Sequence, residues 1–335
     1  MRSSIFSLII TISMALLFSA CAPPPRDPDP TDLYWPMPPD IPRITFMQSV
    51  YSEDDIGRVY SLREKLFGKE YIDTLSRPYS VYARYGKLLV TDIVKKAVLI
   101  FDLSTKRLSF IGSEGGIRYP TAAVMDSTGS IFVADANGGR IAVYDSKGEY
   151  KTAYFVRDGS KLVSLAINEQ LGRLYAVDRN NHRVKVFSLD GKLLFEFGSR
   201  GGENGQFNIP LSVAVDSKGM VYVVDNGNFR IQEFDADGKF ILKFGQVGDA
   251  PGAFANPKGI AVDSEGHIYV TDAAFSNYQV FDQKGNMLIF VGSLGTSAGY
   301  FQLPAGIAID ENDRIYVADQ LNRRVEVFQY IKVDE

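Results

Sequence analysis

Residues 257–285 read PKGIAVDSEGHIYVTDAAFSNYQVFDQKG, and this stretch decides the fold. It contains three apolar runs, GIAVD, IYVTD and YQVFD, which are rich in the β-branched and aromatic residues that favour strands. Between the runs stand Asp, Ser, Glu and Gly, which are typical of turns. The stretch therefore predicts three short strands joined by two turns. One such unit cannot bury its own faces, so the architecture depends on how often it recurs.

The unit recurs six times along the chain. Each copy is anchored on the Asp that ends its second strand, and these anchors are Asp92, Asp135, Asp178, Asp225, Asp272 and Asp319. Successive anchors are 43 or 47 residues apart. Later copies show a fourth apolar run, namely LLFEFG at 193–198, FILKFG at 240–245 and MLIFVG at 287–292. A period in this range with four strands per unit predicts an all-β fold, the six-bladed β-propeller.

The ring is predicted to close through a strand that precedes the first blade. The last copy ends near Phe328, soon after its third strand, and lacks a fourth. Residues 44–50 (ITFMQSV) have the composition of a strand, and we expect them to complete the sixth blade as its outer strand, which removes an exposed sheet edge. Residues 52–75 contain a helix-start signal at Ser52 and apolar residues at helical spacing, which predicts one or two short helices packed against the ring.

The first 20 residues indicate an export signal that is not part of the domain. A short positive start is followed by an almost wholly apolar run from Ile5 to Phe18 and then by small residues. Cys21, the only cysteine, ends the sequence LFSAC, which resembles the lipobox of bacterial lipoproteins. The resemblance implies a signal peptide over residues 1–20 and a diacylated, N-acylated Cys21 inserted in a lipid bilayer. The alternative is an ordinary secretory peptide followed by a chance cysteine.

Residues 21–42 are predicted to form a tether between the anchor and the domain, which is predicted over residues 43–335. The tether holds nine of the 15 prolines, so it is expected to be extended and semi-rigid. Trp35, the only tryptophan, is expected to pack on the edge of the domain, the alternative being a contact with membrane or a partner. Ala22 follows the cysteine where Asp commonly retains lipoproteins in the inner membrane, which favours the outer membrane of the cell envelope.

The blades resemble NHL repeats. Residues 181–184, Asn-His-Arg-Val, carry the namesake pattern of that family. The links GSRGGENGQFNIP (198–210), GQVGDAPGAFANP (245–257) and GSLGTSAGYFQLP (292–304) match its Gly-rich connection to the next proline. The resemblance covers residues 78–328 and is strongest in blades three to six. With the lipobox and the tether, the whole chain resembles bacterial six-bladed NHL-propeller lipoproteins.

Composition and side-chain inventory favour a binding protein over an enzyme. The net charge is −4 and no basic stripe occurs, so nucleic acid is not an expected partner. The two histidines, His182 and His267, fall in loops on opposite faces, and Cys21 is assigned to lipid, so we predict no zinc site, no cofactor and no catalytic residue. The acidic hairpin turns lack the density of carboxylates that calcium requires. The alternative is an envelope enzyme (a lyase or lactonase-like hydrolase) or a small-ligand sensor, with its site at the channel mouth.

Propeller geometry divides the remaining polar residues between two faces. Loops after the second strands lie with the links between blades on one face, here named the top face, and the turns after the first and third strands lie on the bottom face. Four anchors precede an Arg by five residues. We expect each of these Asp residues to cap its own loop and to pair with the Arg, holding blade to blade, the alternative being a ring of functional charges. The top face is predicted to bind an unknown envelope protein through Arg118, Tyr119, Arg179, Asn180, Arg200, Phe229, Asn256, Phe275 and Gln302.

Overall fold

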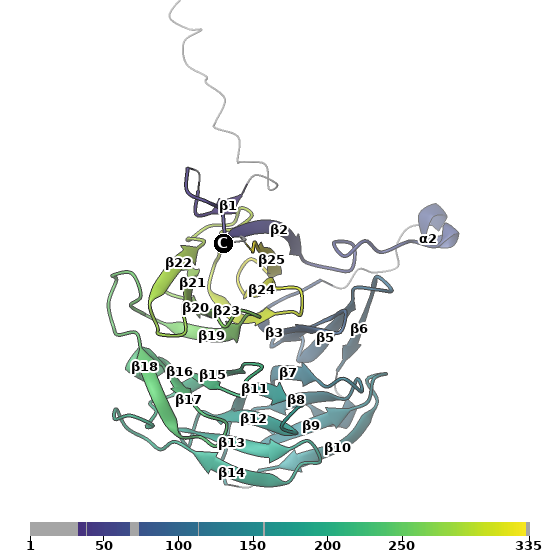
Figure 1. The fold of residues 1–335 in the computed structure, drawn as a ribbon. Coiled ribbons are helices and arrows are strands. Elements are labelled where there is room, and N and C mark those ends of the chain that lie inside the picture. Colours follow the sequence, from purple (N-terminus) through teal and green to yellow (C-terminus); the bar gives the residue numbers. More distant parts are fainter. Residues whose placement is uncertain (1–32, 38, 68–73, 113, 157, 333–335) are drawn as a thin grey trace, which may run out of the picture.

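Strand pairing confirms the six-bladed β-propeller. The computed structural model describes residues 33–37, 39–67, 74–112, 114–156 and 158–332. Cys21, the predicted signal peptide and most of the predicted tether lie outside these residues. Six antiparallel sheets surround a central axis, and the first strand of each repeat lies nearest that axis (Figure 1).

The strands follow the repeats closely. Blades one to three contain β3 (Pro78–Arg84), β4 (Lys87–Asp92), β5 (Ala97–Asp102) and β6 (Arg107–Ile111); β7 (Pro120–Met125), β8 (Ile131–Asp135), β9 (Arg140–Tyr144) and β10 (Tyr150–Phe155); and β11 (Leu162–Asn168), β12 (Arg173–Asp178), β13 (Arg183–Ser188) and β14 (Leu193–Phe197). Blades four to six contain β15 (Pro210–Val215), β16 (Val221–Asp225), β17 (Arg230–Phe234) and β18 (Phe240–Phe244); β19 (Pro257–Val262), β20 (Ile268–Asp272), β21 (Asn277–Phe281) and β22 (Met287–Val291); and β23 (Pro304–Ile309), β24 (Arg314–Asp319) and β25 (Arg324–Tyr330).

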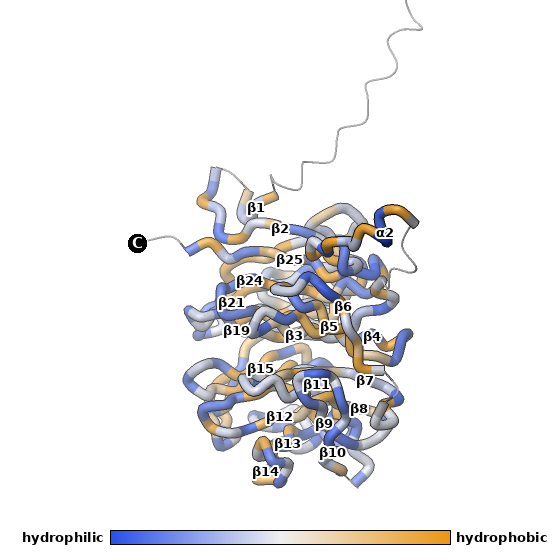
Figure 2. The backbone as a smooth tube through the Cα atoms, turned by 90° about the vertical axis from the view of Figure 1, so that its right-hand side faces the viewer, coloured by the Kyte–Doolittle hydropathy of each residue, from blue (hydrophilic) through white to orange (hydrophobic). Residues whose placement is uncertain are grey.

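The core lies between neighbouring blades. The second strand of a blade is buried along its whole length, as in β8 and β20, because another blade covers each of its faces. The outer strands β18 and β22 alternate between less and more exposed residues, because one of their faces meets solvent. Hydrophobic residues accordingly follow the strands and hydrophilic residues gather in the connections (Figure 2). This explains why the second strands read as continuous apolar runs in the sequence.

The predicted closing strand is confirmed. The strand β2 (Ile44–Val50) pairs antiparallel with β25, and Phe46 lies opposite Phe328. A further short strand, β1 (Tyr34–Trp35), pairs with β2 on the outside, so the sixth sheet has the order β1-β2-β25-β24-β23. The ring of Trp35 packs edge-on against Phe328 with centroids 5.6 Å apart. Part of the segment predicted as tether therefore lies on the propeller, and Trp35 packs on the domain edge.

One short α-helix, α2 (Leu62–Phe67), occurs in the described residues before the first blade. It begins after Ser61, whose backbone N–H donates to Glu64 while the Glu64 N–H donates to the Ser61 hydroxyl. The start signal read at Ser52 instead forms a turn, because the Asp55 carboxylate accepts the backbone N–H of Ser52 at 2.8 Å. Leu62 and Leu66 are exposed and α2 stands away from the blades, so the predicted packing on the ring was wrong (Figure 1).

Two short 3-10 helices, η2 (Glu114–Gly116) and η3 (Asn226–Asn228), lie in top-face connections. Within the part of the chain that the structure describes, no helix is long and apolar enough to cross a membrane.

Candidate functional site

The six anchor Asp residues are buried completely and hold the tops of the blades. Asp225 shows the pattern: its carboxylate accepts the backbone N–H of Asn208 at 2.7 Å, at the start of its own blade, and the Nε–H of Arg230 at 2.8 Å. The predicted pairs with an Arg five residues later are confirmed for Arg140, Arg183, Arg230 and Arg324. A carboxylate that accepts several hydrogen bonds from its own loop is a structural group.

The same arginines fasten the Gly-rich links. The guanidinium of Arg230 donates to the carbonyls of Gly202, Glu203 and Gln206, and that of Arg324 donates to the carbonyls of Ser297 and Tyr300. The anchor pairs of blades four and six thus attach the preceding link to its blade. The carboxylate and guanidinium groups of these pairs interact with partners inside the fold.

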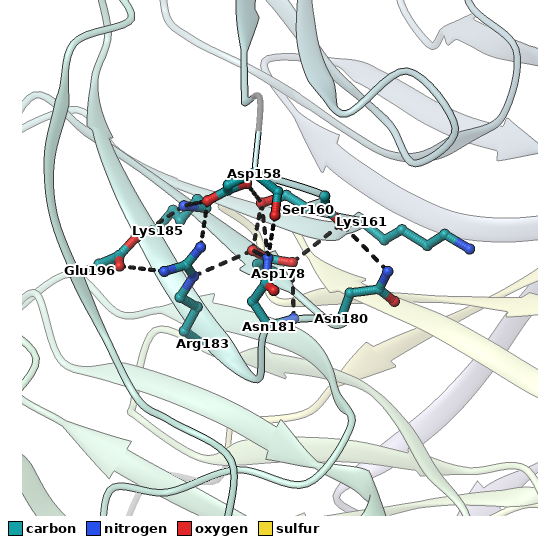
Figure 3. A network of polar contacts seen from close by, with 10 residues as sticks. Asp158, Ser160, Lys161, Asp178, Asn180, Asn181, Arg183, Lys185 and Glu196 are labelled. Carbon is teal, nitrogen blue, oxygen red and sulfur yellow. Dashed lines mark hydrogen bonds and ion pairs between the residues drawn. The ribbon is translucent and has the colours of Figure 1, made fainter.

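In blade three, a network of side chains surrounds the anchor Asp178 and Arg183, at the place where the backbone carbonyls of a Gly-rich link contact the Arg in later blades (Figure 3). The connection before blade three, residues 156–161, is shorter than the link 198–209. Asp158 in this connection accepts hydrogen bonds from Arg183 and, at 2.9 Å, from the buried Lys185. Burial raises the pKa of Asp158, but hydrogen bonds from Ser160 and Lys185 outweigh it and lower this pKa to about 2. The shorter connection accounts for the repeat period of 43 instead of 47 at this point.

The acidic turns of the bottom face hold their own hairpins. Asp263 accepts the backbone N–H groups of Glu265 and His267, and its second oxygen accepts the Tyr269 hydroxyl at 3.0 Å. Asp310 does the same in the sixth blade, with Tyr316 as the hydroxyl donor. Across the described ranges, no group of three or more His, Cys, Asp and Glu residues is arranged to hold a metal ion.

Both histidines have structural partners. The Nδ1 of His182 accepts the backbone N–H of Ile209 at 3.1 Å, which joins a top loop of blade three to the start of blade four. His267 lies in a bottom turn, and its Nδ1 is 2.9 Å from Asp263. The hydrogen bond with Asp263 raises the pKa of His267. Their positions on opposite faces agree with the sequence-based placement.

A cavity of about 510 Å³ occupies the central channel. It extends from the level of Ser80, Ser164 and Ser212 down to the bottom turns. Small residues line it at Ala166, Ala214, Ala261 and Ala308. The glycines of the inner strands permit their close approach: a Cβ on Gly306 would lie 2.7 Å from the Cα of Ser80. The volume falls within the range of small-molecule sites.

The two ends of the channel differ in charge. The bottom mouth is lined by one cation, Arg84, and by the carboxylates of Glu169, Asp216, Asp263, Asp310, Glu311 and Asp313. Tyr85 of blade one reaches across this mouth and donates to Glu169 of blade three at 2.6 Å. At the top opening, the starts of the inner strands and the neighbouring loops carry five cations beside the buried anchor carboxylates, namely Arg77, Arg118, Lys161, Arg179 and Lys258.

The predicted partner-binding residues fall into two groups. Arg118, Arg179, Asn180 and Arg200 are exposed on the top face, whereas Tyr119, Phe229, Asn256, Phe275 and Gln302 are half-buried. The Asn256 side chain accepts a hydrogen bond from Asn226 at 3.0 Å, and Phe229 packs against the core between blades four and five. The arginines and Asn180 are therefore the more accessible members of the set.

Sequence reasoning missed the exposed apolar residues of the top face. Val94, Leu294 and Leu321 are 61%, 72% and 54% exposed. Val94 and Leu321 stand two residues after their anchors, where blades two and three have Asn137 and Asn180. This departure between copies was a signal that the sequence contained.

Comparisons with known proteins agree with the repeat pattern. The NHL repeat matches residues 161–187, 207–234, 254–281 and 301–329, which lie in blades three to six. No curated protein matches the chain.

Solved structures share the fold at low identity. A streptogramin B lyase is 15% identical over 77% of this chain and 94% of its own, with a TM-score of 0.58. An auxiliary nutrient binding protein from Bacteroides thetaiotaomicron is 15% identical over 77% of this chain and 70% of its own, with a TM-score of 0.60. A Bacteroides thetaiotaomicron protein of unknown function is 16% identical over 86% of this chain and 75% of its own, with a TM-score of 0.63. At these identities the likeness concerns the fold alone, and the chain is a six-bladed β-propeller whose blades three to six match the NHL repeat.

Proposed function

We propose that this propeller is a non-catalytic binding module of the bacterial cell envelope. In this proposal acylated Cys21 anchors it in a lipid bilayer, with the outer membrane favoured over the inner, and the top face binds another envelope protein. The observation that carries the proposal is the exposure of Val94, Leu294 and Leu321 on that face. Large exposed apolar side chains and accessible arginines are both typical of protein-binding surfaces.

The polar groups of the blades support a non-catalytic role. The anchor carboxylates and the hairpin carboxylates already accept hydrogen bonds within the fold. A general base or a nucleophile needs a side chain that is free to meet a substrate. The carboxylates that recur in the repeats are therefore not free to act as a general base or a nucleophile.

The top-face proposal predicts a loss of partner capture on substitution of single leucines. Leu294→Glu and Leu321→Glu are each expected to reduce cross-linking to the envelope partner at least tenfold, because a buried carboxylate at an apolar contact is costly. The measurement is affinity capture from cross-linked membranes, with the partner identified by mass spectrometry. Leu288→Glu is the matched control, since Leu288 is 52% exposed on the outer strand β22 and lies on the side of the ring. Equal capture by all three variants would contradict the proposal.

The anchor proposal predicts lipid labelling at one residue. Wild-type protein expressed in bacteria is expected to incorporate radiolabelled palmitate, and the Cys21→Ser variant is expected to incorporate none, because the chain has no other cysteine. Fractionation of the same cells is expected to find only the wild type in the mature, membrane-bound form. Label that persists in the Cys21→Ser variant would refute lipidation at this site.

A second candidate function is the binding or conversion of a small molecule in the channel. The cavity of about 510 Å³ favours it. Streptogramin B lyase and the nutrient binding protein have similar folds, but this likeness carries no activity to the present chain.

A further inference from the structure

We infer that the top opening of the channel holds a binding site for a small oxyanion, a carboxylate or a phosphate group, between Arg179 and Lys258. Lys258 is the second residue of β19, directly after Pro257, which pairs with the anchor Asp272 at the top of blade five. Arg179 directly follows the anchor Asp178, and its backbone N–H donates to the carbonyl of Lys161 at the start of blade three. Lys258 therefore starts from the top end of an innermost strand, and Arg179 starts from the top end of the second strand β12, next to the residue that precedes the innermost strand β11.

Tyr79 brings a third blade to the same place. It holds in β3 the position that Lys258 holds in β19, because it follows Pro78, which pairs with the anchor Asp92. Blades one, three and five alternate around the ring, so their side chains approach one another only near the axis. Electrostatics agree with this placement: burial raises the pKa of Tyr79 and lowers that of Lys258, and the charge on Arg179 lowers both.

The positive charge at this opening is only partly offset: the anchor carboxylate of Asp272 raises the pKa of Lys258, but burial and the charge on Arg179 each lower this pKa by more. Neither Arg179 nor Lys258 forms an ion pair or a side-chain hydrogen bond there, and the same holds for the flanking Arg118 and Lys161. The fully buried cations of the blades behave differently, because Lys185, Arg230 and Arg324 each contact a carboxylate. Two unpaired cations near each other, one of them half-buried, repel each other, and a bound anion would offset that repulsion.

The donors present fit an oxyanion with several acceptor atoms. Arg179 offers a planar fork of N–H groups, Lys258 offers an ammonium, and the hydroxyls of Tyr79 and Tyr119 form no hydrogen bond to any described residue. The cavity begins one strand position below, at Ser80, and its far mouth is acidic. The field along the axis therefore favours an anion at the top opening and disfavours one at the bottom. The inference does not depend on the protein-binding proposal, because it concerns a small group on the axis.

Calorimetric titration of the purified wild-type protein with inorganic phosphate, and separately with succinate, tests the site. Ionic strength is held constant with chloride, so that screening does not change. We expect saturable binding of at least one of the two anions, and the two arms identify the oxyanion. Arg179→Gln and Lys258→Gln are each expected to bind at least tenfold more weakly. Lys243→Gln is the matched control, because Lys243 is an exposed cation on the outer strand β18, and this variant is expected to bind as the wild type does.

Thermal unfolding gives a second readout. Without added anion, Lys258→Gln is expected to unfold at the same temperature as the wild type or higher, because the substitution relieves like-charge repulsion. The anion that binds is expected to raise the unfolding temperature of the wild type but not of this variant. The inference is overturned if neither anion binds saturably to the wild type, or if Arg179→Gln and Lys258→Gln both retain wild-type affinity.

Discussion

Asp225→Ala is expected to lower the free energy of unfolding by about 3–5 kcal/mol, because it leaves a buried cation without its carboxylate. Asp225 is completely buried, and its oxygens accept hydrogen bonds from Asn208, Asn228, Arg230 and Gln232. Arg230 is also buried, and after the substitution only the carbonyls of the link would remain as its partners. The substitution removes at once the cap of the loop, the support of the link and the counter-ion.

Equilibrium denaturation with urea measures the loss. Asp235→Ala in the same blade is the matched control, because Asp235 accepts two backbone N–H groups in its turn but contacts no buried cation. This control is expected to cost about 1 kcal/mol or less, as for a turn or cap residue. Equal losses in the two variants would show that the anchor acts only as a turn residue and that its pair with Arg230 adds nothing.

The repeat made the fold predictable from the sequence. Each blade is a local unit, so strand boundaries and anchor Asp residues could be read from one copy and checked against five others, and the Asp–Arg pairs could be compared among four copies. The closing strand at residues 44–50 was predictable for a different reason, since the sixth blade needed an outer strand and the sequence before the first blade contained one. Resemblance to NHL repeats rests on the same residues.

Residues that depart from the repeat were visible in the sequence, but the sequence did not show which of them lie close together in the fold. Lys258 and Arg179 each stand out among their equivalents, yet they lie in different blades, and no local pattern shows that their side chains approach the axis together. For the aromatic residues Phe229 and Phe275, the burial of the side chains was not predictable. Other copies have mostly polar residues at these positions, and the sequence left open whether the two rings are exposed or tucked against neighbouring loops. Both are half-buried, and Phe229 packs against the core between blades four and five.

The non-repeating segments were the least predictable. Ser52 and Ser61 both carry helix-start signals, and only the second begins a helix, because the Asp55 carboxylate draws the backbone near Ser52 into a turn. Competing side-chain to backbone hydrogen bonds of this kind are not distinguishable by sequence pattern alone.

The strand pair β2–β25, which closes the ring, includes a buried carboxylate whose ionisation lowers the stability of the folded state. Glu326 on β25 is completely buried, accepts the hydroxyl of Ser49 on β2 at 2.6 Å, and contacts Arg324 at 2.8 Å. Arg324 is shared with the anchor Asp319, so two buried carboxylates face one guanidinium. Burial raises the pKa of Glu326 from its ordinary value of 4.5 to about 7, against the opposing effect of Arg324. The equivalent positions in blades four and five are the neutral Gln232 and Gln279.

Glu326→Gln is therefore expected to stabilise the protein by about 1–3 kcal/mol at pH 8 and to have little effect near pH 4.5. Because the folded-state pKa is raised, the stability that Glu326 contributes is fully present below pH 4.5 and is lost as pH rises toward 7. The new amide has a precedent in Gln279, whose oxygen accepts the Gly252 N–H and whose NH₂ donates to the Ala253 carbonyl. Urea denaturation at pH 4.5, 6 and 8 is the measurement, and a difference between variant and wild type that does not grow with pH would contradict the assignment. Ser49→Ala distinguishes the effect of the hydrogen bond between β2 and β25 from the effect of the charge on Glu326, since it removes that hydrogen bond but leaves Glu326 and Arg324 in place.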